Sequence, residues 1–100
     1  MDYLIGLDIG TTNIKALVID AHGRRIACCK IPSGFTTYGM HQVFFADQYW
    51  KLICDLLKDA IAETRRSGVE PGKLRGIAVA SMGEMGFPVG AEDALFPAVS

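Results

Sequence analysis

The sequence lacks a long hydrophobic run and an excess of charge of either sign. Its uninterrupted apolar stretches are only a few residues long, whereas a membrane-spanning helix needs about 20. Asp2 and Asp8 interrupt the segment where a signal peptide would carry basic and then apolar residues. Ten basic residues against eleven acidic ones provide no electrostatic footprint for nucleic acid. We therefore expect a soluble, cytoplasmic protein with no membrane or nucleic-acid partner.

The sequence also has too few cysteines, in the wrong arrangement, for a disulfide framework or a zinc site. The three cysteines are Cys28, Cys29 and Cys54, an odd number of which two are adjacent. This usage predicts reduced, structural thiols. There is no internal repeat, and half of the residues are hydrophobic, which excludes intrinsic disorder.

The chain begins with short apolar segments separated by tight turns. Strands are expected over residues 3–8, 14–19 and 25–32, with turns over residues 10–13 and 20–23. Such turns leave no room for the crossover helix that parallel pairing requires. The pattern therefore predicts an antiparallel meander, in which Asp20 and His22 serve the second turn instead of binding a ligand.

The remainder predicts a loop over residues 33–43, one long helix and a buried strand over residues 74–80. The helix is expected to begin at Asp47 as N-cap, to run for about five turns and to stop at Gly68. Its apolar stripe is Trp50, Ile53, Leu57, Ile61 and Thr64, flanked by Leu56 and Ala60. A hairpin over residues 87–99 is expected to follow.

The segment LDIGTTNIK, residues 7–15, carries the most chemical information. Asp8 ends an apolar strand, where burial would require a partner such as Mg²⁺. Gly10 lets the backbone approach a ligand closely, and turn N–H groups attract anions. The same stretch supplies hydrogen-bonding and cationic side chains from Thr11, Thr12, Asn13 and Lys15. These groups suit a nucleotide phosphate with its metal, although a plain capped hairpin turn remains an alternative.

The segment contains neither the Walker motif nor a Rossmann motif. Instead, it resembles the first phosphate motif of the actin-like ATPase superfamily. The further segments FADQYW, LRGIAVASMGEMG and FPVG…ALFPAVS resemble the N-terminal part of an FGGY-type carbohydrate kinase. The resemblance implies an α/β, ribonuclease-H-like (actin-like ATPase) fold with β-β-β-α-β order followed by a hairpin.

The resemblance also assigns roles to individual residues. Asp8 would hold Mg²⁺ through water, and Lys15 would neutralise phosphate charge. The ATP phosphates would contact Gly10, Thr11, Thr12 and Asn13. The hydroxyls of the substrate would contact Ser81, Met82 and Glu84. Relatives carry other side chains beside Met82, which leaves the identity of the sugar open.

The whole protein is therefore expected to phosphorylate a sugar or polyol hydroxyl with ATP and Mg²⁺. Residues 1–100 would form the N-terminal part of the first domain, because the chain stops at Ser100 directly after an apolar run. The general-base aspartate and the adenosine pocket would lie beyond it, so the piece alone would be inactive. The resemblance leaves room for a homodimer of the full-length protein. A chaperone- or filament-type ATPase and a stand-alone phosphate-binding module are the alternatives.

Overall fold

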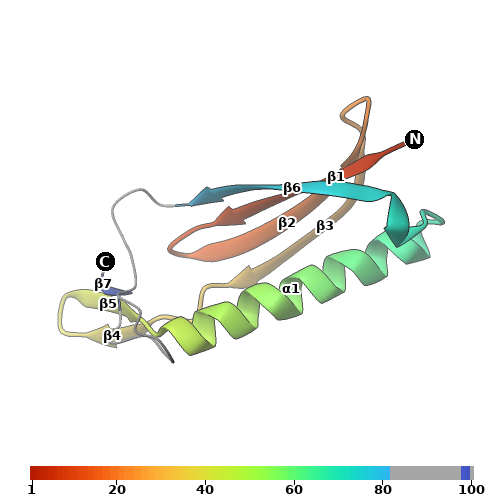
Figure 1. Cartoon of the computed structure of the whole chain (residues 1–100). Coiled ribbons are helices and arrows are strands. Elements are labelled where there is room, and N and C mark those ends of the chain that lie inside the picture. Colours follow the sequence, from red (N-terminus) through yellow and green to blue (C-terminus); the bar gives the residue numbers. More distant parts are fainter. Residues whose placement is uncertain (82–97, 100) are drawn as a thin grey trace, which may run out of the picture.

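In the computed structural model, which describes residues 1–81 and 98–99, one long helix packs against a mixed sheet (Figure 1). The strands are β1 (Tyr3–Ile9), β2 (Asn13–Asp20), β3 (Arg25–Pro32), β4 (Thr36–Tyr38), β5 (His41–Phe44), β6 (Leu74–Ser81) and β7 (Ala98–Val99). The helices are α1 (Ala46–Arg66) and a 3₁₀ turn, η1 (Pro71–Lys73). The larger sheet has the order β3-β2-β1-β6, and β4, β5 and β7 form a smaller sheet.

The predicted antiparallel meander is confirmed. β1 pairs antiparallel with β2, and β2 pairs antiparallel with β3. The first turn joins β1 to β2, and the N–H of Gly10 donates to the carbonyl of Asn13 at 2.9 Å. The second turn places Gly23 at φ +79°, a conformation that glycine adopts without a steric penalty. Both turns thus occur where turn-forming residues interrupt the apolar runs.

β6 returns from α1 and pairs parallel with β1. Asp8 lies opposite Ala80 in this register, and Ile9 lies opposite Ser81. The carboxyl ends of the two strands therefore meet at one edge of the sheet, beside the first turn (Figure 1). Residues far apart in the sequence are brought together there.

The helix covers β2 and β3, and its buried face differs from the predicted stripe. The side chain of Trp50 is 66% exposed, whereas its neighbour Tyr49 is buried and stacks on Phe44 with ring centroids 5.4 Å apart. The buried helix residues are Tyr49, Leu56, Ala60 and Thr64. The sequence places two aromatic residues side by side, and the stripe was assigned to the wrong one. No helix in the described part of the chain combines the length and hydropathy needed to cross a membrane.

The two ends of α1 lie close to their predicted positions. The N-cap is Phe45, which makes no side-chain capping bond, and Asp47 lies in the first turn instead. A carboxylate there interacts favourably with the helix dipole. At the other end Gly68 has φ +91°, and its N–H donates to the carbonyl of Arg65 at 3.1 Å. This left-handed glycine terminates the helix as predicted.

The segment predicted as a loop over residues 33–43 contains a hairpin instead. β4 and β5 pair antiparallel, with Tyr38 opposite His41. Gly34 and Gly39 take positive φ angles of 69° and 60°, which lets the chain turn before β4 and between the two strands. The sequence did not predict this hairpin, because its two strands are short and show little alternation of apolar and polar residues.

The prediction that β6 is a buried strand is wrong. Every β6 residue after Leu74 is exposed, and the side chains of Ile77 and Val79 are 53% and 59% exposed. These side chains are exposed because β6 lies at the edge of the described sheet, whereas α1 packs over β2 and β3. Of the hairpin predicted over residues 87–99, only β7 belongs to the described residues, and it pairs with β5. The other residues of that hairpin lie outside the described part.

Candidate functional site

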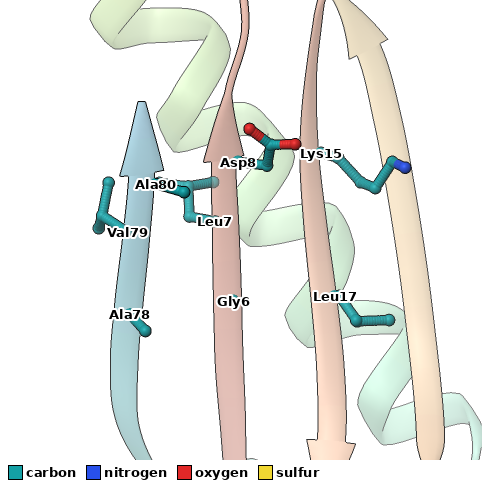
Figure 2. A pocket seen from close by; sticks show the side chains of 8 residues that line it. All are labelled: Gly6, Leu7, Asp8, Lys15, Leu17, Ala78, Val79 and Ala80. Atoms are coloured by element: carbon teal, nitrogen blue, oxygen red, sulfur yellow. The ribbon is translucent and has the colours of Figure 1, made fainter. Parts of the chain in front are cut away.

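The sheet is hollowed where β1, β2 and β6 lie side by side, near the ends of β1 and β6 (Figure 2). The hollow has a volume of about 370 Å³. It is lined by Gly6, Leu7, Asp8, Lys15, Leu17, Ala78, Val79 and Ala80. Small side chains on β1 and β6 keep it open, and Asp8 and Lys15 supply its charged groups. An apolar hollow with a carboxylate and an ammonium group is a candidate ligand site.

The Asp8 side chain is exposed, so the expectation that it is buried is wrong. It lies on the solvent-facing side of β1, directly opposite Lys15 in the β1–β2 register. Figure 2 shows Lys15 extending toward β3, away from the Asp8 carboxylate. Among the described residues, neither side chain forms an ion pair. Both charges therefore remain available to a ligand.

The turn that follows Asp8 presents free backbone donors. Within the described ranges no group accepts a hydrogen bond from the N–H of Thr11 or Thr12. Gly10 is required in this turn, because a Cβ atom there would lie 2.7 Å from the carbonyl oxygen of Asn13. Adjacent unpaired N–H groups in a tight turn form a concave site for an anion such as phosphate.

Two buried hydroxyl groups bond to this turn from its core-facing side, and neither was predicted from the sequence. Ser33 Oγ and Tyr49 Oη each donate to the carbonyl oxygen of Gly10 at 2.8 Å. In addition, the N–H of Ser33 donates to the carbonyl of Thr12 at 2.9 Å. Ser33 and Tyr49 are only 2% and 5% exposed. The available signal was a tyrosine near the start of the predicted helix, but the predicted apolar stripe contained its neighbour Trp50 and did not include Tyr49.

A magnesium ion fits the residues present. The described part of the chain contains no cluster of three side chains that would hold a metal without help. Mg²⁺ typically keeps several waters and takes one or two carboxylates together with substrate phosphates. Asp8 is exposed, and within residues 1–81 neither its carboxylate nor the N–H groups of Thr11 and Thr12 have a partner, so the carboxylate and the turn could hold the ion together with a phosphate. Asp8 would therefore hold the ion at the same place where the turn would hold the phosphates.

One of the three predicted substrate residues belongs to the described structure. Ser81 is exposed at the end of β6, opposite Ile9 and next to the turn. The parallel register thus brings Ser81 to the same edge as Asp8 and Gly10. Met82 and Glu84 lie outside the described residues.

Nearly the whole chain matches one family model. Residues 3–100 match the N-terminal domain of the FGGY family of carbohydrate kinases. The chain belongs to the FGGY family. The resemblance carried by LDIGTTNIK and the later segments is thereby confirmed.

Two curated relatives and one solved structure illustrate the similarity. A protein named "Probable L-xylulose kinase" from Pasteurella multocida is 28% identical over 91 residues, covering 87% of this chain and 18% of the relative. A D-ribulokinase from Saccharomyces cerevisiae is 28% identical over 82 residues, covering 75% of this chain and 10% of the relative. The Plasmodium falciparum glycerol kinase with ADP superposes with a TM-score of 0.81 at 11% identity, covering 99% of this chain and 20% of that one.

These comparisons confirm the predicted actin-like ATPase fold, with the β-β-β-α-β order interrupted by the additional β4–β5 hairpin. The chain spans less than a fifth of the length of either curated relative.

The three cysteines of this FGGY chain form no disulfide, and they differ in exposure, since Cys28 is exposed and the other two are half-buried. Cys28, Cys29 and Cys54 are all free. Burial raises the pKa of the Cys29 thiol, and the negative charges of Glu63 and Asp59 act in the same direction. A raised pKa favours the protonated form of the Cys29 sulfur, which is the less reactive form.

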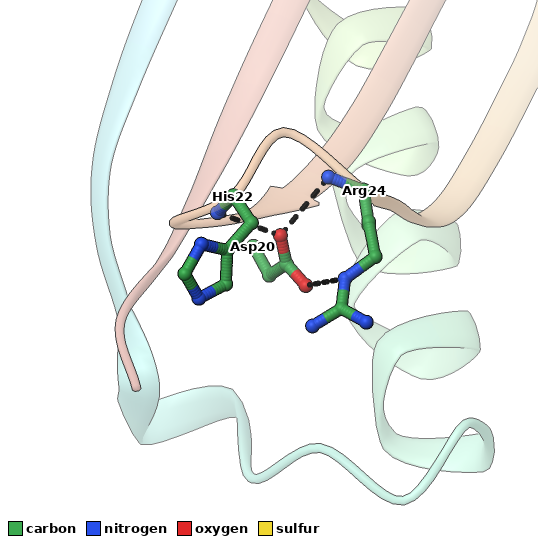
Figure 3. A network of polar contacts seen from close by, with 3 residues as sticks. All are labelled: Asp20, His22 and Arg24. Carbon is green, nitrogen blue, oxygen red and sulfur yellow. Dashed lines mark hydrogen bonds and ion pairs between the residues drawn. The ribbon is translucent and has the colours of Figure 1, made fainter.

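Asp20 serves the second turn of the FGGY chain, as predicted (Figure 3). Its Oδ1 accepts from the backbone N–H of His22 at 2.8 Å and of Arg24 at 2.9 Å. Its Oδ2 pairs with Arg24 Nε at 3.0 Å. The backbone bond from Arg24 is the main cause that holds the pKa of Asp20 below its ordinary value, while burial opposes the shift. The Asp20 carboxylate therefore closes the turn through its contacts with His22 and Arg24.

Replacing Asp20 with asparagine is expected to lower the melting temperature of the protein at neutral pH. A carboxylate with a lowered pKa stabilises the fold above its unfolded-state pKa of about 3.9, and this contribution disappears as the pH falls through the folded-state pKa. The difference in melting temperature between wild type and Asp20→Asn should therefore shrink in acid. Asp59→Asn, at an exposed helix position, is the control. A difference that persists unchanged to low pH would contradict this account.

Proposed function

We propose that the full-length protein containing this chain transfers the γ-phosphoryl group of ATP to a hydroxyl of a sugar or polyol. The observation that carries the proposal is the β1–β6 register, which brings Ser81 beside Asp8 and the Gly10–Asn13 turn. A kinase needs its phosphate donor and its acceptor hydroxyl at one place, because positioning supplies most of the catalysis. Membership in the carbohydrate kinase family supports the same reaction.

On the phosphate side, each group of the chain has a distinct role in this proposal. The N–H groups and side chains of the turn, from Gly10 through Thr11, Thr12 and Asn13, bind phosphate oxygens. Asp8 would hold Mg²⁺ through water, and Lys15 would offset phosphate charge. When bound, the ion neutralises the charge that develops on the phosphates. The bridging bond to the β-phosphate breaks as the acceptor oxygen bonds to the γ-phosphorus; ADP leaves, and the general-base aspartate expected outside residues 1–100 accepts the proton of the acceptor hydroxyl.

On the acceptor side, Ser81 binds a substrate hydroxyl, and Met82 and Glu84 complete this contact in the proposal. A carboxylate accepts hydrogen bonds from two hydroxyls, which suits a polyol. Residues 1–100 form the N-terminal part of the first domain. The remainder of that domain and a second domain supply the general-base aspartate and the adenosine pocket. The names of the two curated relatives, an L-xylulose kinase and a D-ribulokinase, favour ketopentoses as the first acceptors to test.

The test is the formation of ADP by the full-length protein with MgATP and a panel of ketopentoses, pentitols and glycerol. We expect one acceptor to stimulate ADP formation at least about tenfold over the acceptor-free rate. ATP hydrolysis that no acceptor stimulates would favour a chaperone- or filament-type ATPase. Absence of any nucleotide turnover or binding would favour a phosphate-binding module. A cytoplasmic location and a homodimer remain predictions.

A further inference from the structure

The conformation of the β1–β2 turn is fixed by groups from outside it. The carbonyl oxygen of Gly10 accepts two hydrogen bonds of 2.8 Å, one from Ser33 Oγ and one from Tyr49 Oη. Ser33 follows the end of β3, and Tyr49 lies in the first part of α1. A carbonyl oxygen has two lone pairs, so these two hydroxyls satisfy it completely. Two elements distant in sequence thus hold one carbonyl of the turn.

Fixing this carbonyl also fixes the N–H group that belongs to the same peptide unit. The Gly10 carbonyl and the Thr11 N–H share one planar, trans peptide bond, in which they point in opposite directions. Because the carbonyl is held toward the buried side by Ser33 and Tyr49, the Thr11 N–H is directed away from the core. That N–H has no partner within the described residues.

The Thr12–Asn13 peptide is also held by a group from outside the turn. The N–H of Ser33 donates to the carbonyl of Thr12 at 2.9 Å. Ser33 therefore contacts the turn through both its backbone and its side chain, and it is 2% exposed. Tyr49 is similarly buried, and burial raises the pKa of its hydroxyl, which keeps the group protonated and able to donate.

We propose that Ser33 and Tyr49 are positioning residues that hold the Gly10–Thr11 peptide with its N–H directed at the nucleotide phosphate. The inference rests on the proposed function for the identity of the ligand. The clamp itself, defined as the hydrogen bonds from Ser33 and Tyr49 to the turn, rests on geometry alone. Neither residue touches the phosphate; each acts through the backbone of the turn.

The first experiment measures MgADP affinity by titration calorimetry on full-length protein. Tyr49→Phe removes one hydroxyl and keeps the ring stacked on Phe44. We expect it to raise the dissociation constant for MgADP about tenfold, and Ser33→Ala to act in the same direction. In the double variant, the loss of binding free energy for MgADP should exceed the sum of the losses in the two single variants, because the Gly10 carbonyl then has neither hydroxyl partner.

Matched controls separate this role from general destabilisation. Tyr38→Phe alters an exposed tyrosine of β4, and Ser67→Ala removes a hydroxyl that bonds the Thr64 carbonyl at the far end of α1. Both controls should bind MgADP as the wild type does. In steady-state kinetics, Tyr49→Phe should raise KM for MgATP and leave KM for the acceptor unchanged. A smaller fraction of folded protein would instead lower the apparent kcat and leave both KM values unchanged.

The second experiment measures the clamp without any ligand. Hydrogen exchange of the peptide covering residues 10–14 should be several-fold faster in Tyr49→Phe than in wild type or Tyr38→Phe, since the Gly10 N–H bond to Asn13 loosens. Unchanged exchange would overturn the clamp. Faster exchange with unchanged MgADP affinity would overturn its role in phosphate positioning. If the wild type does not bind MgADP, the proposed function fails, and the exchange comparison then decides the clamp on its own.

Discussion

The Gly10→Ala variant of the full-length protein is expected to lose about 100-fold in kcat/KM for MgATP. A Cβ at this position would lie 2.7 Å from the carbonyl oxygen of Asn13, which is backbone and has no flexible side chain to move aside. The turn must shift to relieve the contact, and its free N–H groups shift with it. A displacement of about 1 Å in a positioning element can cost on the order of 100-fold in rate.

Gly72→Ala provides the matched control for this substitution. The nearest atom to a Cβ at Gly72 is Glu70 Cγ at 3.9 Å, an ordinary van der Waals contact, and the residue lies in η1. Steady-state kinetics and melting temperatures of both variants should be compared. The Gly10→Ala variant should remain folded and lose activity, while Gly72→Ala keeps both. If the Gly10→Ala variant kept the wild-type kcat/KM, the turn would not be part of the phosphate site.

Asp8→Asn is expected to lower kcat by about 10- to 100-fold and to raise the Mg²⁺ concentration needed for half-maximal activity. The substitution keeps the size of the side chain and removes the charge that would hold the waters of the ion. Groups that orient a metal through its outer shell typically contribute about this much to affinity or activity. Asp8 is exposed and unpaired among the described residues, so little structural stability should depend on it.

The control for Asp8 is Asp2→Asn, which alters a carboxylate preceding β1. Asp2 is 65% exposed and pairs with Arg75 at 3.4 Å, a surface contact that contributes little to stability. Measuring the Mg²⁺ dependence of turnover for both variants separates a metal role from a change in surface charge. If Asp8→Asn retains the wild-type Mg²⁺ dependence, Asp8 does not hold the ion.

The meander and its tight first turn were predictable because both depend on local sequence. Turn residues such as Gly10 and Gly23 interrupt short apolar runs, and glycine is needed where the backbone crowds or turns left-handed. The family resemblance rested on motifs placed in the right order along the chain. Local patterns of this kind can be interpreted from the sequence without knowledge of tertiary contacts.

The features that escaped prediction depend on contacts between distant segments. The Ser33 and Tyr49 hydroxyls reach the Gly10 carbonyl across 23 and 39 residues, and no local pattern indicates which carbonyl a hydroxyl will find. Trp50 and Tyr49 are adjacent aromatics, so helical periodicity alone did not decide which one is buried. The exposure of β6 follows from its edge position, which is set by sheet order.

The most direct test of the central claim is a crystal structure of the full-length protein with MgADP. The account predicts phosphate oxygens within about 3 Å of the Thr11 and Thr12 nitrogens, with a metal ion whose waters face Asp8. Ser33 and Tyr49 would still donate to the Gly10 carbonyl in that structure. A nucleotide whose phosphates bind elsewhere, leaving the β1–β2 turn without contact, would contradict the account.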